Sequence, residues 1–145
     1  MTRRILHPSD FSSASRAAFR AAVALAKQNR AELVIAHVLT PILPVADGYV
    51  SPAVFAEMET GGRRYGRKHV DALVAKARRA GARARGVLLE GVVSDRIVRA
   101  AKAQRADTIV MGTHGRTGLS RFILGSVASR VVGHASCPVL TVRGT

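Results

Sequence analysis

Short apolar runs alternate along the chain with longer stretches in which apolar residues recur every three or four positions. Runs of the first kind are typical of strands in a parallel sheet, and stretches of the second kind are typical of amphipathic helices. The predicted strands are 5–7, 33–39, 86–90, 107–111 and 138–143, and the predicted helices are 13–29, about 53–80, 94–104 and about 126–134. This alternation predicts an α/β fold of three layers, in which helices cover both faces of a parallel sheet.

Prolines and glycines interrupt the pattern between the second and third predicted strands. Pro41, Pro44 and Pro52 mark a loop, and the helical stretch after it contains Gly61-Gly62 and Gly66. Because glycine weakens the interior of a helix, we expect this helix to bend or break there.

The composition fits one domain, placed at residues 1–145. Of the 145 residues, 48% are hydrophobic and only 4% aromatic, so the core must consist of aliphatic side chains. The single cysteine, Cys137, excludes an internal disulfide and fits a reducing compartment. The chain reaches Pro8 before a signal peptide could form, and no apolar run is long enough to span a membrane. We therefore expect a cytoplasmic protein with no membrane insertion.

The net charge of +14 is unusual, and much of it lies in residues 63–85, where Lys and Arg far outnumber the one acid, Asp71. Such a basic stretch can bind nucleic acid or another polyanion. The other interpretation is a solvated helix face, which we favour because aromatic residues that could stack on bases are nearly absent.

Two predicted strand ends carry residues suited to a ligand. Pro8-Ser9-Asp10 follows the first strand, and a loop rich in glycine, residues 112–126, follows the fourth. Ligands of such sheets bind beyond the carboxyl ends of strands, where the strand order reverses.

The glycine loop ends in Gly125-Ser126, directly before a predicted helix. A helix N-terminus offers backbone N–H groups and a positive dipole end to a phosphate; Gly125 would let an oxygen approach the backbone, and the Ser126 hydroxyl could donate. The alternative is a tight turn without a ligand. The loop matches neither a P-loop, which has a lysine before Ser or Thr, nor the close glycines of a dinucleotide fold.

The spacing Gly112-x2-Gly115-x9-Gly125-Ser126 resembles the G-x2-G-x9-G-(S/T) motif of the ATP-binding subgroup of the universal stress protein family. Three other segments, 5–10, 36–38 and 136–142, are similar to that family as well, so the resemblance covers nearly the whole chain.

This resemblance implies a five-stranded sheet in the order 3-2-1-4-5, related to the adenine nucleotide α-hydrolase and Rossmann-like folds. It also implies ATP as the ligand, with Asp10 near the ribose or a phosphate-bound Mg²⁺ or Mn²⁺, and Val38 near the adenine. The nucleotide-binding residues it suggests are Pro8, Ser9, Asp10, Val38, Met111, Gly112, His114, Gly115, Arg116, Gly125, Ser126, Val127 and Ala128.

The implied function is that of a small regulatory protein of the stress response, which acts through nucleotide-dependent contacts with an unknown protein partner. A homodimer is expected through the last strand, 138–143, because an apolar sheet edge invites a second chain and many members of the family dimerise there. Two alternatives stay open: a nucleic-acid- or polyanion-binding protein that uses residues 63–85, and a nucleotide-hydrolysing enzyme of the related α-hydrolase group. Those enzymes usually carry a Ser-Gly-Gly-rich loop after the first strand, and this chain does not.

No residue is predicted to be catalytic, and any ATP hydrolysis is expected to be slow. Asp10 could be a ligand or only the cap of the first helix. His114 is interpreted as a packing or hydrogen-bonding side chain rather than as a general base, because no carboxylate or nucleophile lies near it in sequence. His7 and His37 could meet on adjacent strands, but no further ligand suggests a metal site. Cys137 is expected to pack as a small side chain rather than to react.

Overall fold

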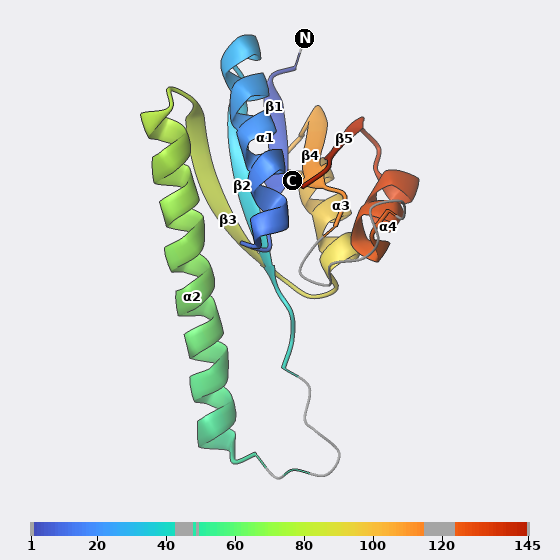
Figure 1. Ribbon diagram of the computed structural model, residues 1–145. Helices are drawn as coiled ribbons and strands as arrows, with labels where there is room; N and C mark the ends of the chain where they lie inside the picture. Colours follow the sequence, from blue (N-terminus) through green and yellow to red (C-terminus); the bar gives the residue numbers. More distant parts are fainter. Residues whose placement is uncertain (1, 43–47, 49, 115–123, 145) are drawn as a thin grey trace.

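The predicted strands form one parallel sheet in the computed structural model, in the order β3-β2-β1-β4-β5 (Figure 1). The structure describes residues 2–42, 48, 50–114 and 124–144. The strands are β1 (Arg4–Pro8), β2 (Glu32–Leu39), β3 (Arg83–Glu90), β4 (Thr108–Gly112) and β5 (Val139–Val142). All neighbouring strands pair in parallel, so the predicted order is confirmed.

Helices cover both faces of this sheet, as predicted. They are the 3₁₀ turn η1 (Ser13–Ser15) and the helices α1 (Arg16–Asn29), α2 (Pro52–Arg79), α3 (Val93–Ala103) and α4 (Ser126–His134). Successive residues of β1 point to opposite faces: Ile5 packs with side chains of α1 and α2, and Leu6 packs with side chains of α3 and α4. The protein is therefore a single α/β domain of three layers.

Helix α2 is continuous, so the prediction that it bends or breaks at its glycines is wrong. A Cβ on Gly66 would lie 3.2 Å from side-chain atoms of both Leu39 and Leu88, so this glycine allows the helix to pack closely on β2 and β3. Pro52 occupies the first turn instead of a loop, a position where its missing N–H costs nothing, and the hydroxyl of Ser51 caps the helix by accepting from the N–H of Val54 at 3.2 Å.

The N-terminal half of α2 projects beyond the sheet (Figure 1). Although α2 has 28 residues, no helix in the described ranges is apolar enough over a sufficient length to cross a membrane.

One histidine is part of the core. His7 of β1 has no exposed surface, and its Nδ1 donates to the carbonyl oxygen of Val110 at 2.8 Å. Burial lowers its pKa from 6.5 to about 4, against the opposing effects of that hydrogen bond and of the charge on Asp10. His7 is therefore neutral in the folded protein at neutral pH.

We expect acid to destabilise the fold through His7. The unfolded chain protonates this side chain near pH 6.5 and the folded chain only near pH 4, so protonation favours unfolding. The free energy of unfolding should fall by up to about 1.4 kcal/mol per pH unit between these two values. Urea unfolding at pH values from about 7 to about 4.5 measures the slope.

The matched variant is His7→Asn, whose amide can donate to the same carbonyl oxygen but does not titrate. Its unfolding free energy should change less steeply with pH than that of the unaltered protein. Parallel curves for the two proteins would show that another group causes the acid sensitivity.

Candidate functional site

A cleft of about 630 Å³ lies at the carboxyl ends of β1, β2 and β4, beside the start of α4. It marks the point where the strand order reverses, because the chain leaves β1 for α1 on one face and leaves β4 for α4 on the other. We call it the nucleotide cleft, after the ligand that the sequence analysis expects there.

Every predicted site residue that the structure describes lines this cleft. These residues are Pro8, Ser9, Asp10, Val38, Met111, Gly112, His114, Gly125, Ser126, Val127 and Ala128. Gly115 and Arg116 lie outside the described residues. The strand topology thus brings three separated segments of the chain to one place.

The N-terminus of α4 forms one wall of the cleft. The N–H groups of Ser126, Val127 and Ala128 belong to the first turn, so they have no acceptor within the helix. The N-cap residue, Gly125, has no side chain that could cap this end. Backbone donors and the helix dipole together make this wall suited to a phosphate.

Gly125, which lines the cleft, also has a packing role. Its N–H donates to the carbonyl oxygen of Thr113 at 2.8 Å, and a Cβ at this position would lie only 2.9 Å from that oxygen. The oxygen that approaches this glycine is therefore one of the protein's own, and the contact fixes the start of α4 against the end of β4.

Asp10 lines the cleft together with the first turn of α4. Its Oδ1 accepts from the N–H of Ser12 at 3.0 Å and from the hydroxyl of the same serine, which orders the chain just before η1. The prediction that Asp10 caps the first helix is wrong, because the N-cap residues are Ser12 for η1 and Ser15 for α1. Its side chain instead orders the turn before η1, and it lines the cleft.

The opposite wall is apolar. Val38, Ile97 and Met111 line it, and each is less than a tenth exposed. They belong to the core beneath α3 and α4, so the wall is rigid and has the character that the face of a planar base prefers.

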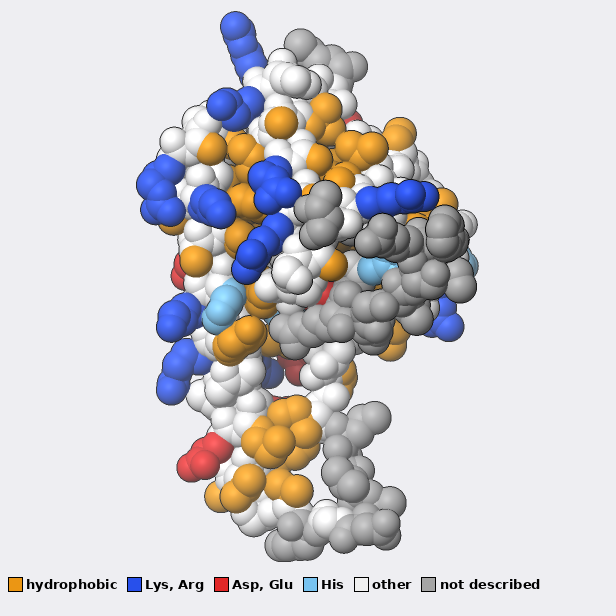
Figure 2. Space-filling view, viewed as in Figure 1, with side chains coloured by type: hydrophobic (Ala, Val, Ile, Leu, Met, Phe, Trp, Pro, Cys, Tyr) orange, Lys and Arg blue, Asp and Glu red, His pale blue; other side chains and the backbone are white. Residues whose placement is uncertain are grey.

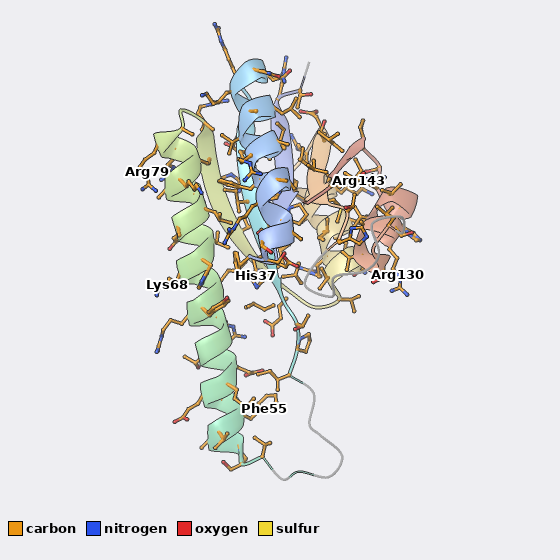
Figure 3. The ribbon with its side chains drawn as sticks, viewed as in Figure 1. His37, Phe55, Lys68, Arg79, Arg130 and Arg143 are labelled. Atoms are coloured by element: carbon orange, nitrogen blue, oxygen red, sulfur yellow. The ribbon has the colours of Figure 1, made fainter. Side chains whose placement is uncertain are left out.

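Two histidines line the cleft with defined orientations. The Nδ1 of His37 donates to the carbonyl oxygen of Ser9 at 2.8 Å, and its ring stacks on Phe11 at a centroid distance of 4.2 Å (Figure 3 labels His37 at the end of β2). The Nδ1 of His114 lies 2.9 Å from the hydroxyl oxygen of Thr113. The hydrogen-bonding role predicted for His114 is therefore present in the structure.

The described residues contain no group of three or more His, Cys, Asp or Glu side chains that could hold a metal ion. Asp10 is the only carboxylate among the described residues that line the cleft, so a metal ion there would take its other ligands from nucleotide phosphates. Cys137 is half-buried against the core beneath α3 and α4, and burial raises the pKa of its thiol, which disfavours the reactive thiolate.

Sequence reasoning missed several residues of the cleft. Thr113 lies between the predicted residues Gly112 and His114, and Thr40 directly follows the predicted strand 33–39, so their places in the sequence could have suggested both. Gly62 and Tyr65 gave no signal, because they reach the cleft only through the packing of an unbroken α2 along the sheet edge. The missed lining residues are Ser15, His37, Leu39, Thr40, Gly62, Tyr65, Val93, Ile97 and Thr113.

Sequence comparison relates this chain to known proteins over almost its full length. It is 36% identical to a universal stress protein of Methanocaldococcus jannaschii, over 97% of this chain and 82% of that protein. It is 33% identical to a universal stress protein of Bacillus subtilis, over 99% of this chain and all of that protein.

Solved structures share the fold. The universal stress protein of Lactobacillus plantarum superposes with a TM-score of 0.84 at 28% identity, over 98% of each chain. A universal stress protein in complex with cAMP superposes with a TM-score of 0.69 at 25% identity, over 99% of this chain and 98% of that one. An Arabidopsis thaliana protein of the universal stress protein family, with AMP bound, superposes with a TM-score of 0.71 at 22% identity, over 99% of this chain and 92% of that one.

A family model decides the assignment, because it matches residues 1–143, which include every strand and helix described above. The chain belongs to the universal stress protein family.

Proposed function

We propose that this universal stress protein binds ATP in the nucleotide cleft and acts in the stress response through nucleotide-dependent contacts with a protein partner. One observation carries the proposal: the uncapped N-terminus of α4 lies in one cleft with Asp10 and with the apolar wall around Val38. These three surfaces match the three parts of the nucleotide: its phosphates, its ribose or a phosphate-bound metal ion, and its adenine base. The adenine nucleotides in related structures support the same chemistry, since one holds cAMP and another AMP.

In this arrangement the phosphates occupy the N-terminus of α4, held by the N–H groups of Ser126, Val127 and Ala128. The adenine lies against Val38 and Met111. Asp10 binds the ribose hydroxyls or a Mg²⁺ or Mn²⁺ ion that the phosphates also ligate. Gly115 and Arg116 complete the site on the strength of the family motif.

The placement of α4 can be tested by adding one methyl group. Gly125→Ala puts a Cβ about 2.9 Å from the carbonyl oxygen of Thr113, so α4 must move away from β4 and its N–H groups leave their positions. We expect the affinity for ATP, measured by calorimetry, to fall by at least about tenfold, which corresponds to 1.4 kcal/mol.

Gly133→Ala is the matched control, because it makes the same change in the same helix where nothing lies within 4 Å of the new Cβ. It should keep the ATP affinity and gain up to about 1 kcal/mol of stability, since alanine favours a helix interior. Equal ATP affinity in folded Gly125→Ala and in the unaltered protein would place the nucleotide elsewhere.

Hydrolysis of ATP should be slow. Among the described residues that line the cleft, the only carboxylate that could act as a general base is Asp10, and it is engaged with Ser12. We expect fewer than about one turnover per minute, below the range of typical enzymes. His114→Ala should leave both ATP affinity and this slow rate within about twofold, a difference well under 1 kcal/mol. Rapid release of phosphate that this substitution abolishes, with binding intact, would assign His114 as a general base.

The dimer expected through the last strand forms, in our proposal, along the edge of β5. The carbonyl oxygens of Pro138 and Val142 accept from N–H groups on the β4 side, and main-chain groups alternate in direction along a strand. The N–H and C=O of Thr141 therefore point outward, available to a second copy of the chain.

Thr141→Pro removes that outward N–H and spares the pairing with β4. We expect the unaltered protein and the control Thr141→Val to sediment as dimers at micromolar concentration, and Thr141→Pro as a folded monomer. A monomeric unaltered protein, or a dimeric Thr141→Pro, would contradict this interface.

A further inference from the structure

A second cavity, of about 350 Å³, lies between α1 and α2. We call it the basic groove, because Arg16 and Arg20 of α1 and Lys76 and Arg79 of α2 line it. Figure 2 shows Lys and Arg side chains gathered over these two helices, and Figure 3 places Arg79 near the C-terminal end of α2.

Four other cations of the basic stretch at 63–85 are engaged in the fold. Arg63 pairs with Glu90 at 3.3 Å, and Arg85 pairs with Glu32 at 2.9 Å. The guanidinium groups of Arg78 and Arg83 donate to backbone carbonyl oxygens. These residues therefore contribute to the stability of the fold rather than to a binding surface.

The four cations of the basic groove lack such partners. None of them forms a salt bridge within the described part of the chain, and no Asp or Glu is among the residues that line the groove. Arg16 and Arg20 are one helical turn apart, as are Lys76 and Arg79, so each pair lies on one face of its helix. The folded protein thus holds four like charges around one cavity.

The base of this groove is apolar. Phe19 and Leu73 line it, and Phe19 is only 6% exposed. The Nζ of Lys76 lies 6.0 Å from the centre of the Phe19 ring. Walls of low dielectric constant focus the field of like charges that surround a cleft, so an anion in this groove would be attracted more strongly than at an open surface.

We propose that the basic groove is a second anion site, which binds a compact polyanion such as an oligophosphate or a small molecule with several phosphate groups. Four converging cations around a small cavity match a ligand whose charge is concentrated. A single-stranded nucleic acid fits less well, since it needs aromatic faces for its bases. Of the aromatic side chains that line the groove, Phe19 is buried, Phe11 already stacks on His37, and His69 contacts Tyr65.

The basic groove is separate from the nucleotide cleft. Ser9 and Ser15 line both cavities, and the segment from 9 to 15 forms the wall between them. No cationic residue of the groove is among those that line the cleft. The proposal therefore stands whether or not the cleft binds ATP.

Calorimetry with inorganic tripolyphosphate in the absence of Mg²⁺ tests whether the groove binds a polyanion. The salt concentration should be about 150 mM, because the Debye length is then about 8 Å and distant charges are screened. We expect one tripolyphosphate per chain and a higher melting temperature when it binds. Arg16→Gln with Arg20→Gln should weaken binding by at least about tenfold. Gly125→Ala, which alters the nucleotide cleft, should bind tripolyphosphate like the unaltered protein.

The matched control is Arg64→Gln with Arg67→Gln, which removes the same charge from exposed positions of α2 outside the groove. It should change the affinity for tripolyphosphate by less than about twofold at this ionic strength.

An equal loss of affinity in both double variants would mean attraction by net charge alone and would overturn the proposal. So would a loss of tripolyphosphate binding in Gly125→Ala, which would locate the anion in the cleft. Tighter binding of a single strand of about twelve nucleotides than of tripolyphosphate, weakened by both double variants, would instead assign the face to nucleic acid.

Discussion

The reversal of strand order between β1 and β4 is the constraint on which the rest of the structure depends. The two strands are neighbours and parallel, yet the chain leaves β1 for α1 on one face of the sheet and leaves β4 for α4 on the other. Because the connections diverge, a cleft opens at the two carboxyl ends. Asp10 and Met111, which are 101 positions apart in sequence, consequently line one cleft.

Glycines shape this cleft, because they let separate backbone segments approach one another closely. A Cβ on Gly112 would lie 3.2 Å from the carbonyl oxygen of His114 and 3.6 Å from that of Ala14, so the end of β4 passes close to the chain that enters η1. Gly125 makes the equivalent approach between α4 and Thr113. Packing therefore requires Gly112 and Gly125, and the position of the first-turn N–H groups of α4 follows from where that packing puts the helix.

The sequence predicted those features whose causes are local. The apolar runs gave the strands, and Gly125-Ser126 gave the start of α4, because burial on both faces and a helix N-terminus each leave a short signature. The continuity of α2 could not be predicted in the same way. Gly66 weakens an isolated helix, and only the contact with Leu39 and Leu88 shows why a side chain would be worse there.

The roles of the charged residues could not be predicted from the sequence either. The basic stretch at 63–85 was evident in the sequence, but its residues have different roles in the structure. Arg63 and Arg85 pair with acidic residues from elsewhere in the chain. Lys76 and Arg79 line the basic groove with two arginines of α1. Nothing in the spacing of Arg16 and Arg20 singled them out, since the groove exists only where two helices lie side by side on the sheet. Long-range packing, rather than the local density of cations, decides which charges remain without a partner.

The wall between cleft and groove shows how the fold supports a strained residue at this junction. Phe11 has a φ of 64°, in the left-handed region, which costs a non-glycine residue roughly 1–3 kcal/mol. Its N–H donates to the Ser9 hydroxyl at 3.1 Å, and its ring stacks on His37 and approaches His69 at 5.1 Å. The carbonyl oxygen of Ser9 accepts from His37, so the partner of the ring is itself fixed. Together these contacts outweigh the strain, and they hold the ring of Phe11 against α2, where it lines the basic groove.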